Sequence, residues 1–317
     1  MKTKKIILLI VLLIAIGIVL FLYIPKTQKD NWVKETPEIK HSQAREKEVW
    51  GEILRGNDAP LYYGTPLYDL AKEMTCFSKF RSDEKIEKLI NEIPKEYINF
   101  QDDKYGKTIG QFALFVGNLK AVRQLLDRGL NPNLIANDGD ALIIDINGPF
   151  KSNLPESLET LKYMIKKGAN VNLYSKNAQL GTPLVVAAYS NFENVKVLVE
   201  AGADPHFIDE FSARPFQSPL SAALVSRRIE IVNYLIFNQK VDFRTLKQPM
   251  DSKFHPGEYV ILHNLREMFF KLDSKEYKEK MKLVAYLKTQ GLDYWITPIQ
   301  ERYKNNPNYT PEYLSKY

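Results

Sequence analysis

The chain of 317 residues contains few of the residue types that build reactive sites. It has a single cysteine, Cys76, which excludes an internal disulfide and is best interpreted as a small core thiol. Its four histidines are scattered without the spacing of metal ligands. There is no glycine-rich phosphate loop, no serine nucleophile elbow and no cysteine paired with a histidine base. These absences predict a protein that is not an enzyme and that has no catalytic residue, metal, cofactor or small-molecule substrate.

Over most of the chain, basic and acidic residues are nearly balanced in number. The net charge is +6, from 44 basic and 38 acidic residues. Three of the basic residues, Lys2, Lys4 and Lys5, stand together at the N-terminus. Elsewhere lysines and arginines alternate with acidic residues, which is typical of solvated helix faces. Nucleic-acid binding needs a basic surface, so we expect no nucleic-acid partner.

One long uncharged run is present near the N-terminus. It begins at Ile6 and ends at Ile24, which makes 19 residues, and lysines flank it on both sides. As a helix it would be about 28 Å long, enough to cross the hydrocarbon core of a bilayer. No small-residue cleavage site ends the run, and no nearby cysteine could carry a lipid. We therefore expect residues 1–24 to form a cytoplasmic tip and an uncleaved transmembrane anchor.

Two alternatives for this run are a cleaved signal peptide and a buried helix of a soluble domain. Its orientation is only weakly constrained, because the lysines on the two flanks are similar in number. The denser charge at the N-terminal end favours a cytosolic N-terminus. Residues 25–61, which are charged and poor in apolar side chains, would then be a tether. The rest of the chain would lie on the non-cytoplasmic side of the inner membrane, in the periplasm of a bacterium.

The remainder of the sequence repeats one pair of signals. The start signal, as in Gly181-Thr182-Pro183-Leu184, has a hydroxyl that caps a helix and a proline suited to its first position. The stop signal, as in Gly202-Ala203-Asp204, places a glycine just past the last helical residue. Further start signals lie at 64–67, 106–108 and 218–220, and further stop signals at 129–133, 168–172 and 291–293.

Small residues recur between these signals, as at Ala113, Ala187 and Ala222, where paired helices must approach closely. With a period of about 30–40 residues, the pattern resembles ankyrin repeats. The resemblance implies an all-α solenoid of about six helix-turn-helix repeats at 62–294, preceded by the transmembrane helix and followed by a capping tail at 295–317. The third repeat carries an insertion at 148–153, and the sixth is degenerate.

In ankyrin proteins the loop tips and the concave face of the first helices contact partners. The resemblance therefore implies a set of partner-binding residues on these two features. At the tips they are Tyr105, Lys107, Asn177, Gln179, Phe211 and Arg214, and on the first helices Phe115, Tyr189 and Val225. Aromatic side chains and arginine are frequent binding anchors. The alternative is that aromatic residues such as Phe115 and Phe211 pack between repeats.

The resemblance implies a membrane-anchored, non-catalytic module that binds another protein. Anchored bacterial ankyrin proteins of this size resemble partners of secreted toxins. We therefore expect an immunity protein that binds and neutralises such a toxin, for example a phospholipase effector. The alternative is an envelope scaffold or stress-accessory ankyrin protein that binds a periplasmic enzyme.

Overall fold

The computed structural model describes residues 55–317 except for 57, 76–80, 175–180, 210–217, 249 and 251–255. The described residues belong to one compact unit, Ile53–Tyr317. The uncharged run at 6–24 and Cys76 lie outside the described residues. Within the described ranges no helix has the length and apolar character needed to cross a membrane. The described backbone is helical, with isolated β-bridges and no strands.

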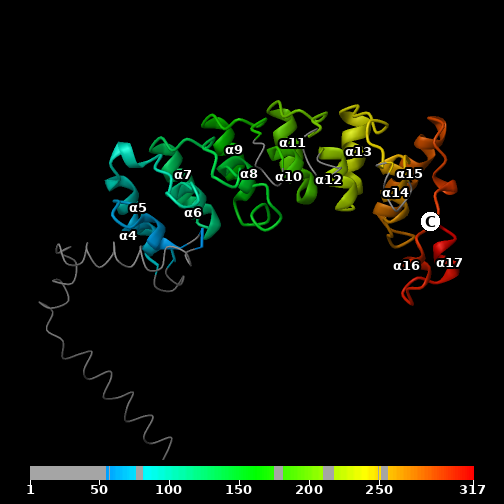
Figure 1. Ribbon diagram of the computed structural model, residues 1–317, viewed down its shortest axis with the longest axis horizontal. Helices are drawn as coiled ribbons and strands as arrows, with labels where there is room; N and C mark the ends of the chain where they lie inside the picture. Colours follow the sequence, from blue (N-terminus) through cyan, green and yellow to red (C-terminus); the bar gives the residue numbers. More distant parts are fainter. Residues whose placement is uncertain are drawn as a thin grey trace, which may run out of the picture. The chain divides into compact units, whose positions relative to one another are not determined.

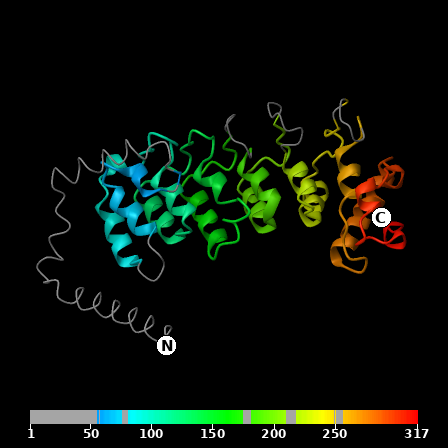
Figure 2. The same ribbon diagram turned by 60° about the horizontal axis from the view of Figure 1, so that its bottom comes forward.

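The helices α4 to α15 follow one another as six pairs, which lie in a row in Figures 1 and 2. The first helices of the pairs are α4 (Tyr68–Thr75), α6 (Ile109–Phe115), α8 (Leu142–Asp145), α10 (Pro183–Ser190), α12 (Pro219–Val225) and α14 (Val260–Arg266). The second helices are α5 (Asp83–Glu92), α7 (Leu119–Asp127), α9 (Ser157–Lys166), α11 (Phe192–Glu200), α13 (Ile229–Asn233) and α15 (Lys275–Thr289). A π-helical turn, η4 (Tyr234–Asn238), extends α13.

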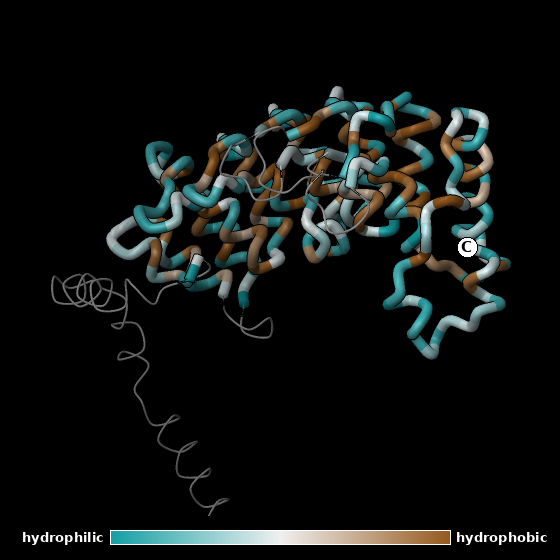
Figure 3. The backbone as a smooth tube through the Cα atoms, turned by 45° about the vertical axis from the view of Figure 1, so that its right-hand side comes forward, coloured by the Kyte–Doolittle hydropathy of each residue, from teal (hydrophilic) through white to brown (hydrophobic). Residues whose placement is uncertain are grey.

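The pairs stack as two layers. Each first helix packs on the first helix of the next pair, and each second helix on the next second helix. We call these the first-helix layer and the second-helix layer. Between them lies one continuous apolar core, visible in Figure 3 as hydrophobic stretches that recur along every pair. Because each pair buries apolar surface against its neighbours as well as within itself, the pairs stabilise one another.

The start signals begin helices as the sequence predicts. The Thr182 hydroxyl accepts a hydrogen bond from the Val185 backbone N–H at 3.4 Å, and Pro183 takes the first helical position of α10. Thr108 with Gln111 and Ser218 with Ser221 form capping boxes at the starts of α6 and α12. These caps satisfy backbone N–H groups that a helix start leaves without a partner.

The stop signals also link successive repeats. The Asn172 side chain donates to the Gly202 carbonyl at 2.8 Å and accepts from the Asp204 N–H at 2.8 Å. Asn133 makes the same two bonds to Gly168 and Asn170 in the preceding repeat. Each asparagine thereby fixes the turn of the next repeat.

The fifth helix pair ends without a glycine, because Gln239 and Lys240 stand at the position of the stop signal. The backbone there is still left-handed: Lys240 has a φ of 58°, a conformation that costs a residue with a side chain more free energy than it costs glycine.

The third pair is irregular because of its insertion. Helix α8 is only four residues long, and Pro149 follows Gly148 shortly after its end. Proline disfavours helical geometry in the residue before it, which ends the helix early. Residues 148–153, the insert loop, turn back on themselves through hydrogen bonds from the Lys151 and Ser152 N–H groups to the Gly148 carbonyl.

The C-terminal segment covers the last pair with η5 (Tyr294–Ile296), α16 (Glu301–Lys304) and α17 (Pro311–Leu314). Tyr317 is buried, and its hydroxyl accepts from the Phe270 N–H at 2.6 Å. Beneath its ring lies the buried Lys280 ammonium, 4.1 Å from the ring centroid, which donates to the Met268 carbonyl at 3.1 Å. The segment 295–317 therefore contributes side chains to the last part of the core.

Candidate functional site

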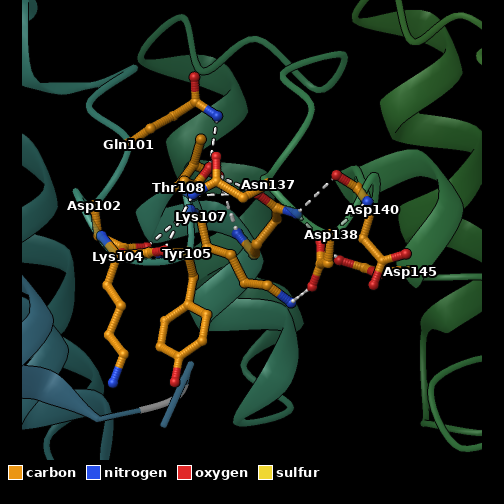
Figure 4. A network of polar contacts seen from close by, with 12 residues as sticks. Gln101, Asp102, Lys104, Tyr105, Lys107, Thr108, Asn137, Asp138, Asp140 and Asp145 are labelled. Atoms are coloured by element: carbon orange, nitrogen blue, oxygen red, sulfur yellow. Dashed lines mark hydrogen bonds and ion pairs between the residues drawn. The ribbon is translucent and has the colours of Figure 1, made fainter. Parts of the chain in front are cut away.

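The loop before α6 presents two of the predicted binding residues. Asp102, which is buried, accepts backbone hydrogen bonds from Lys104 at 3.0 Å, Tyr105 at 2.7 Å and Lys107 at 2.8 Å, as Figure 4 shows. Three bonds to one carboxylate hold the turn in a single shape. The Tyr105 carbonyl in turn accepts from the Asn137 N–H at 2.9 Å, which fixes this loop to the loop of the next repeat.

Gly106 is required at this turn. Its φ is 67°, and a Cβ atom there would lie 2.8 Å from the Asn137 side-chain oxygen. Both the backbone conformation and the close approach of the neighbouring loop exclude a larger residue. The positions of Tyr105 and Lys107, on either side of this glycine, are therefore set by backbone geometry.

A pocket of about 380 Å³ lies between this loop and the first-helix layer. Its lining comes from three successive first helices, α6, α8 and α10, from the two neighbouring loops and from the insert loop. The residues around it are Gly56, Tyr105, Lys107, Gln111, Leu114, Phe115, Asp138, Asp140, Ile144, Asp145, Gly148, Lys151 and Val186. The pocket thus combines aromatic and aliphatic walls with several charged groups, a composition typical of binding sites.

The charged groups divide into a neutralised part and an acidic part. Lys107 Nζ lies 3.0 Å from Asp138 Oδ2 in an ion pair. Burial lowers the pKa of Lys107, but its bond to Asp138 and the nearby Asp145 outweigh this, so the pKa is raised. Asp140 and Asp145 lie beside each other at the far side of this pair (Figure 4). The Gln111 amide donates to Asp145 Oδ2 at 3.3 Å.

Burial and mutual repulsion disfavour the ionised forms of these two carboxyls. Burial, then the charge of Asp140, raise the pKa of Asp145 to about 7. The pKa of Asp140 is also raised, by burial and then by Asp138. Two neighbouring carboxyls that resist ionisation together hold a proton until a cation compensates them.

The insert loop forms the other rim of the pocket. Its Lys151 ammonium lies 4.9 Å from the centroid of the Phe115 ring and donates to the Phe115 carbonyl. Burial lowers the pKa of Lys151. Phe150, next to it, is 86% exposed, and Phe115 is 53% exposed. Two large aromatic side chains are thus open to solvent, one that lines the pocket and one in the insert loop.

The structure brings together three of the nine residues predicted from the sequence, since Tyr105, Lys107 and Phe115 all line the pocket. The alternative that Phe115 packs between repeats does not fit its exposure. Tyr189, half-buried on α10, and Val225, 52% exposed on α12, lie on the same layer but do not line the pocket. The other four predicted residues, Asn177, Gln179, Phe211 and Arg214, lie outside the described residues.

Sequence reasoning missed the residues that give the pocket its charge and its outer rim. In the sequence, Asp138 and Asp140 lie between two repeats, where aspartate is typical of turns. Asp145 follows an apolar run, which indicates a residue near the hydrophobic core. Lys151 and Phe150 belong to an insertion whose position alone marks it as a departure from the repeat pattern. Phe150, a large apolar residue in this insertion, is the feature of the sequence that could have indicated a binding surface here.

The arrangement supports binding and gives no basis for metal chemistry. Over the described ranges, no group of three or more histidine, cysteine, aspartate or glutamate side chains is placed to hold a metal ion. The acids of the pocket face lysines, a glutamine and aromatic rings, which suit recognition of a polar group flanked by apolar atoms.

Comparison with known families identifies the repeats. Residues 153–245 match a family model for ankyrin repeats, in three copies. The match covers the helices α9 to α13. No curated protein sequence matches the chain. Ankyrin-repeat proteins are generally binding modules without catalytic activity. Residues 153–245 are thus ankyrin repeats, and such repeats imply a protein–protein interaction module.

Proposed function

We propose that this protein binds another protein through the first-helix layer around the α6–α8 pocket. The observation that carries the proposal is a pocket of about 380 Å³ together with two exposed phenylalanines: Phe115, which lines the pocket, and Phe150, which belongs to the insert loop that also lines it. Single exposed apolar residues are common on protein surfaces, but two large ones beside a concave site favour a binding surface. Nothing in this arrangement needs a chemical step by the protein itself.

We also propose that the repeats are held at a membrane by residues 6–24, on the non-cytoplasmic side. This part of the proposal rests on the uncharged run and its lysine flanks. Of the stretch 25–61, the part before the compact unit Ile53–Tyr317 would act as a tether between the bilayer and the repeats, since Ala59 and Leu61 are buried in the core. A binding module placed there meets proteins that cross the envelope.

The partner we propose is a secreted toxin, for example a phospholipase effector, so that the protein acts as an immunity protein. Neutralising an enzyme requires only that a stable surface cover its active site, and a repeat stack supplies a rigid surface without any catalytic group. A rigid layer also loses little conformational entropy on binding, which favours high affinity.

The test uses the full-length chain with an affinity tag, produced in its native host and purified with its bound proteins. The wild type should retain a partner, and the Phe115→Ala/Phe150→Ala variant should lose it by at least tenfold, with an unchanged circular dichroism spectrum. The toxin part of the proposal predicts that the retained protein is a secreted lipase-type enzyme and that adding the wild-type chain abolishes its activity.

The matched control is Lys196→Ala/Glu200→Ala on α11 of the second-helix layer, which should retain the partner as the wild type does. Loss of the partner in this control, with normal retention by the phenylalanine variant, would overturn the assignment of the binding face. A partner that is an active periplasmic enzyme, unaffected by the chain, would contradict the toxin proposal while leaving the binding face in place.

A further inference from the structure

We infer that the α6–α8 pocket receives a cationic side chain, a lysine or an arginine, from the bound protein. The inference deepens the proposed function, because it names the chemistry by which that face recognises its partner. It rests on three observations: a pair of carboxyls without a counter-cation, apolar walls that lead to them, and lysines whose positive charges are already engaged.

The first observation concerns the two carboxyls on the α8 side of the pocket. Among the ion pairs between described residues, Lys107 binds Asp138, and neither Asp140 nor Asp145 has a basic partner. Asp145 accepts from the neutral Gln111 amide at 3.3 Å and is hydrogen-bonded with Asp140, while the Lys107 charge acts on both carboxyls without forming an ion pair with either. Ionised carboxylates held away from water without an ion-pair partner are costly, so a cation that reaches this pair would be bound strongly.

The second observation is the shape and composition of the approach. Leu114, Ile144 and Val186 supply an aliphatic wall from three successive first helices, and Tyr105 and Phe115 supply aromatic rings. A lysine or arginine side chain has an apolar stem that packs on such walls while its charged end reaches polar groups. The volume, about 380 Å³, is at the small end of ligand pockets, which range over roughly 300–1,000 Å³.

The third observation argues against an anion as the preferred ligand of the pocket. The Lys107 ammonium is paired with Asp138 at 3.0 Å. The Lys151 ammonium donates to the Phe115 carbonyl and lies over the Phe115 ring. An anion would have to compete with both arrangements and approach Asp140 and Asp145 as well, whereas a cation meets two carboxyls that no ion pair neutralises.

Binding of a cation should also displace a proton from the pocket. The groups that face Asp145 are Asp140, Asp138, Lys107, Gln111 and, from the insert loop, Lys151. With burial and Asp140 raising the pKa of Asp145 to about 7, the pair retains a proton under mildly acidic conditions. Affinity for a cation should therefore rise on the order of tenfold between pH 6 and pH 8.

The experiment uses three small probes of similar shape and ligand-observed NMR on the full-length chain. n-Butylguanidinium carries the positive charge, n-butylurea is its neutral analogue, and valerate is an anion. We expect saturable binding of n-butylguanidinium at millimolar concentration and pH 8, with at least tenfold weaker binding of the other two probes. Binding should weaken on the order of tenfold at pH 6.

The variant Asp140→Asn/Asp145→Asn should lose n-butylguanidinium binding by at least tenfold and lose the pH dependence. Asparagine keeps the shape and polarity of each side chain, and circular dichroism verifies that the repeats remain folded. The control Glu193→Gln removes a carboxylate from the surface of α11, where it pairs with Lys196, and should bind as the wild type does.

Three results would overturn the inference. Absence of n-butylguanidinium binding would show that there is no cation site, equal binding of n-butylurea would show that the pocket does not select charge, and stronger binding of valerate would show an anion site at Lys107 and Lys151. The outcome is independent of the proposed function. If the probes behave as expected but no partner is retained, the cation site stands and the protein-binding proposal fails. If a partner depends on Phe115 and Phe150 but the probes do not bind, the protein-binding proposal stands and the cation site fails.

Discussion

The Lys151 ammonium lies over the ring of Phe115, 4.9 Å from its centroid, and donates a hydrogen bond to the carbonyl of the same residue. This contact joins the insert loop of the third repeat to the end of α6 in the second repeat. Phe150, the residue before Lys151, is 86% exposed. An insertion that departs from the repeat pattern is thereby made part of the rigid first-helix layer.

We predict that Lys151→Met releases the insert loop from α6. The variant loses the hydrogen bond and the cation–π contact, which together are worth about 1 kcal/mol at a partly exposed site. Amide hydrogen exchange in residues 148–153 should become faster, while exchange in α10 and α11 stays unchanged. Unchanged exchange in the loop would show that the loop is held by its own internal hydrogen bonds to Gly148 and Pro149.

The fourth repeat offers a test of the start signal. Thr182→Ala removes the cap of α10 and should lower the free energy of unfolding by about 1 kcal/mol. Leu184 is 1% exposed in the core, so Leu184→Ala should cost more, roughly 2–5 kcal/mol. Urea melts followed by circular dichroism measure both values.

The control for this pair is Lys196→Ala, on the solvent side of α11, where the loss should be within about 0.5 kcal/mol. Small and equal losses for Thr182→Ala and Leu184→Ala would contradict the placement of this helix in the core of the stack.

We predict that Lys280, buried near the C-terminus, makes the free energy of unfolding depend on pH. Burial, with the nearby Arg266 charge, lowers the pKa of Lys280 to about 6. In the unfolded chain the same lysine titrates near its ordinary pKa of about 10.4, so between these values the unfolded state binds more protons than the folded state. The free energy of unfolding should therefore rise from pH 6.5 to pH 9, on the order of 1 kcal/mol per pH unit from this group.

The variant Lys280→Met should lose this rise, because methionine fills a similar space without a titrating group. The comparison is the slope of unfolding free energy against pH in the two proteins. A slope that is the same in both would show that Lys280 is protonated in the folded state, held by the Tyr317 and Tyr294 rings.

Much of the fold could be predicted because its signals are local. Thr182 and Pro183 start a helix, and Gly202 ends one, through contacts with residues a few positions away. Two features of the fold could not be predicted from the sequence, each for a physical reason. Lys240 occupies a left-handed position that sequence rules assign to glycine, and the end of the chain forms side-chain contacts with residues about 47 positions earlier, as Tyr317 does with Phe270.

The candidate site could be predicted only in part. Tyr105, Lys107 and Phe115 stand at positions that the repeat pattern marks, so the sequence indicates them directly. The acidic pair could not be found in this way. Asp140 lies in a loop and Asp145 at a helix end, and only the stacking of α8 against α6 brings them to the Lys107 side chain of the preceding repeat.

The proposed anchor makes a prediction about the mature protein. If residues 6–24 span the membrane, the full-length chain should stay in the membrane pellet after alkaline carbonate extraction, and its N-terminus should be intact. A chain that lacks residues 1–24 should be extracted as a soluble protein that keeps the helical circular dichroism spectrum and the cooperative unfolding of the repeats. A natural product that begins near Pro25 would indicate a cleaved signal peptide instead.

The central claim is that the first-helix layer around the α6–α8 pocket contacts a partner protein, and site-specific photocrosslinking in the native host measures this most directly. A photoreactive phenylalanine analogue replaces Phe150 in one full-length chain and Lys196 in another. The account predicts a crosslinked protein from position 150, lost when Asp140 and Asp145 are both changed to asparagine, and none from position 196. A crosslink from position 196 with none from position 150 would contradict it.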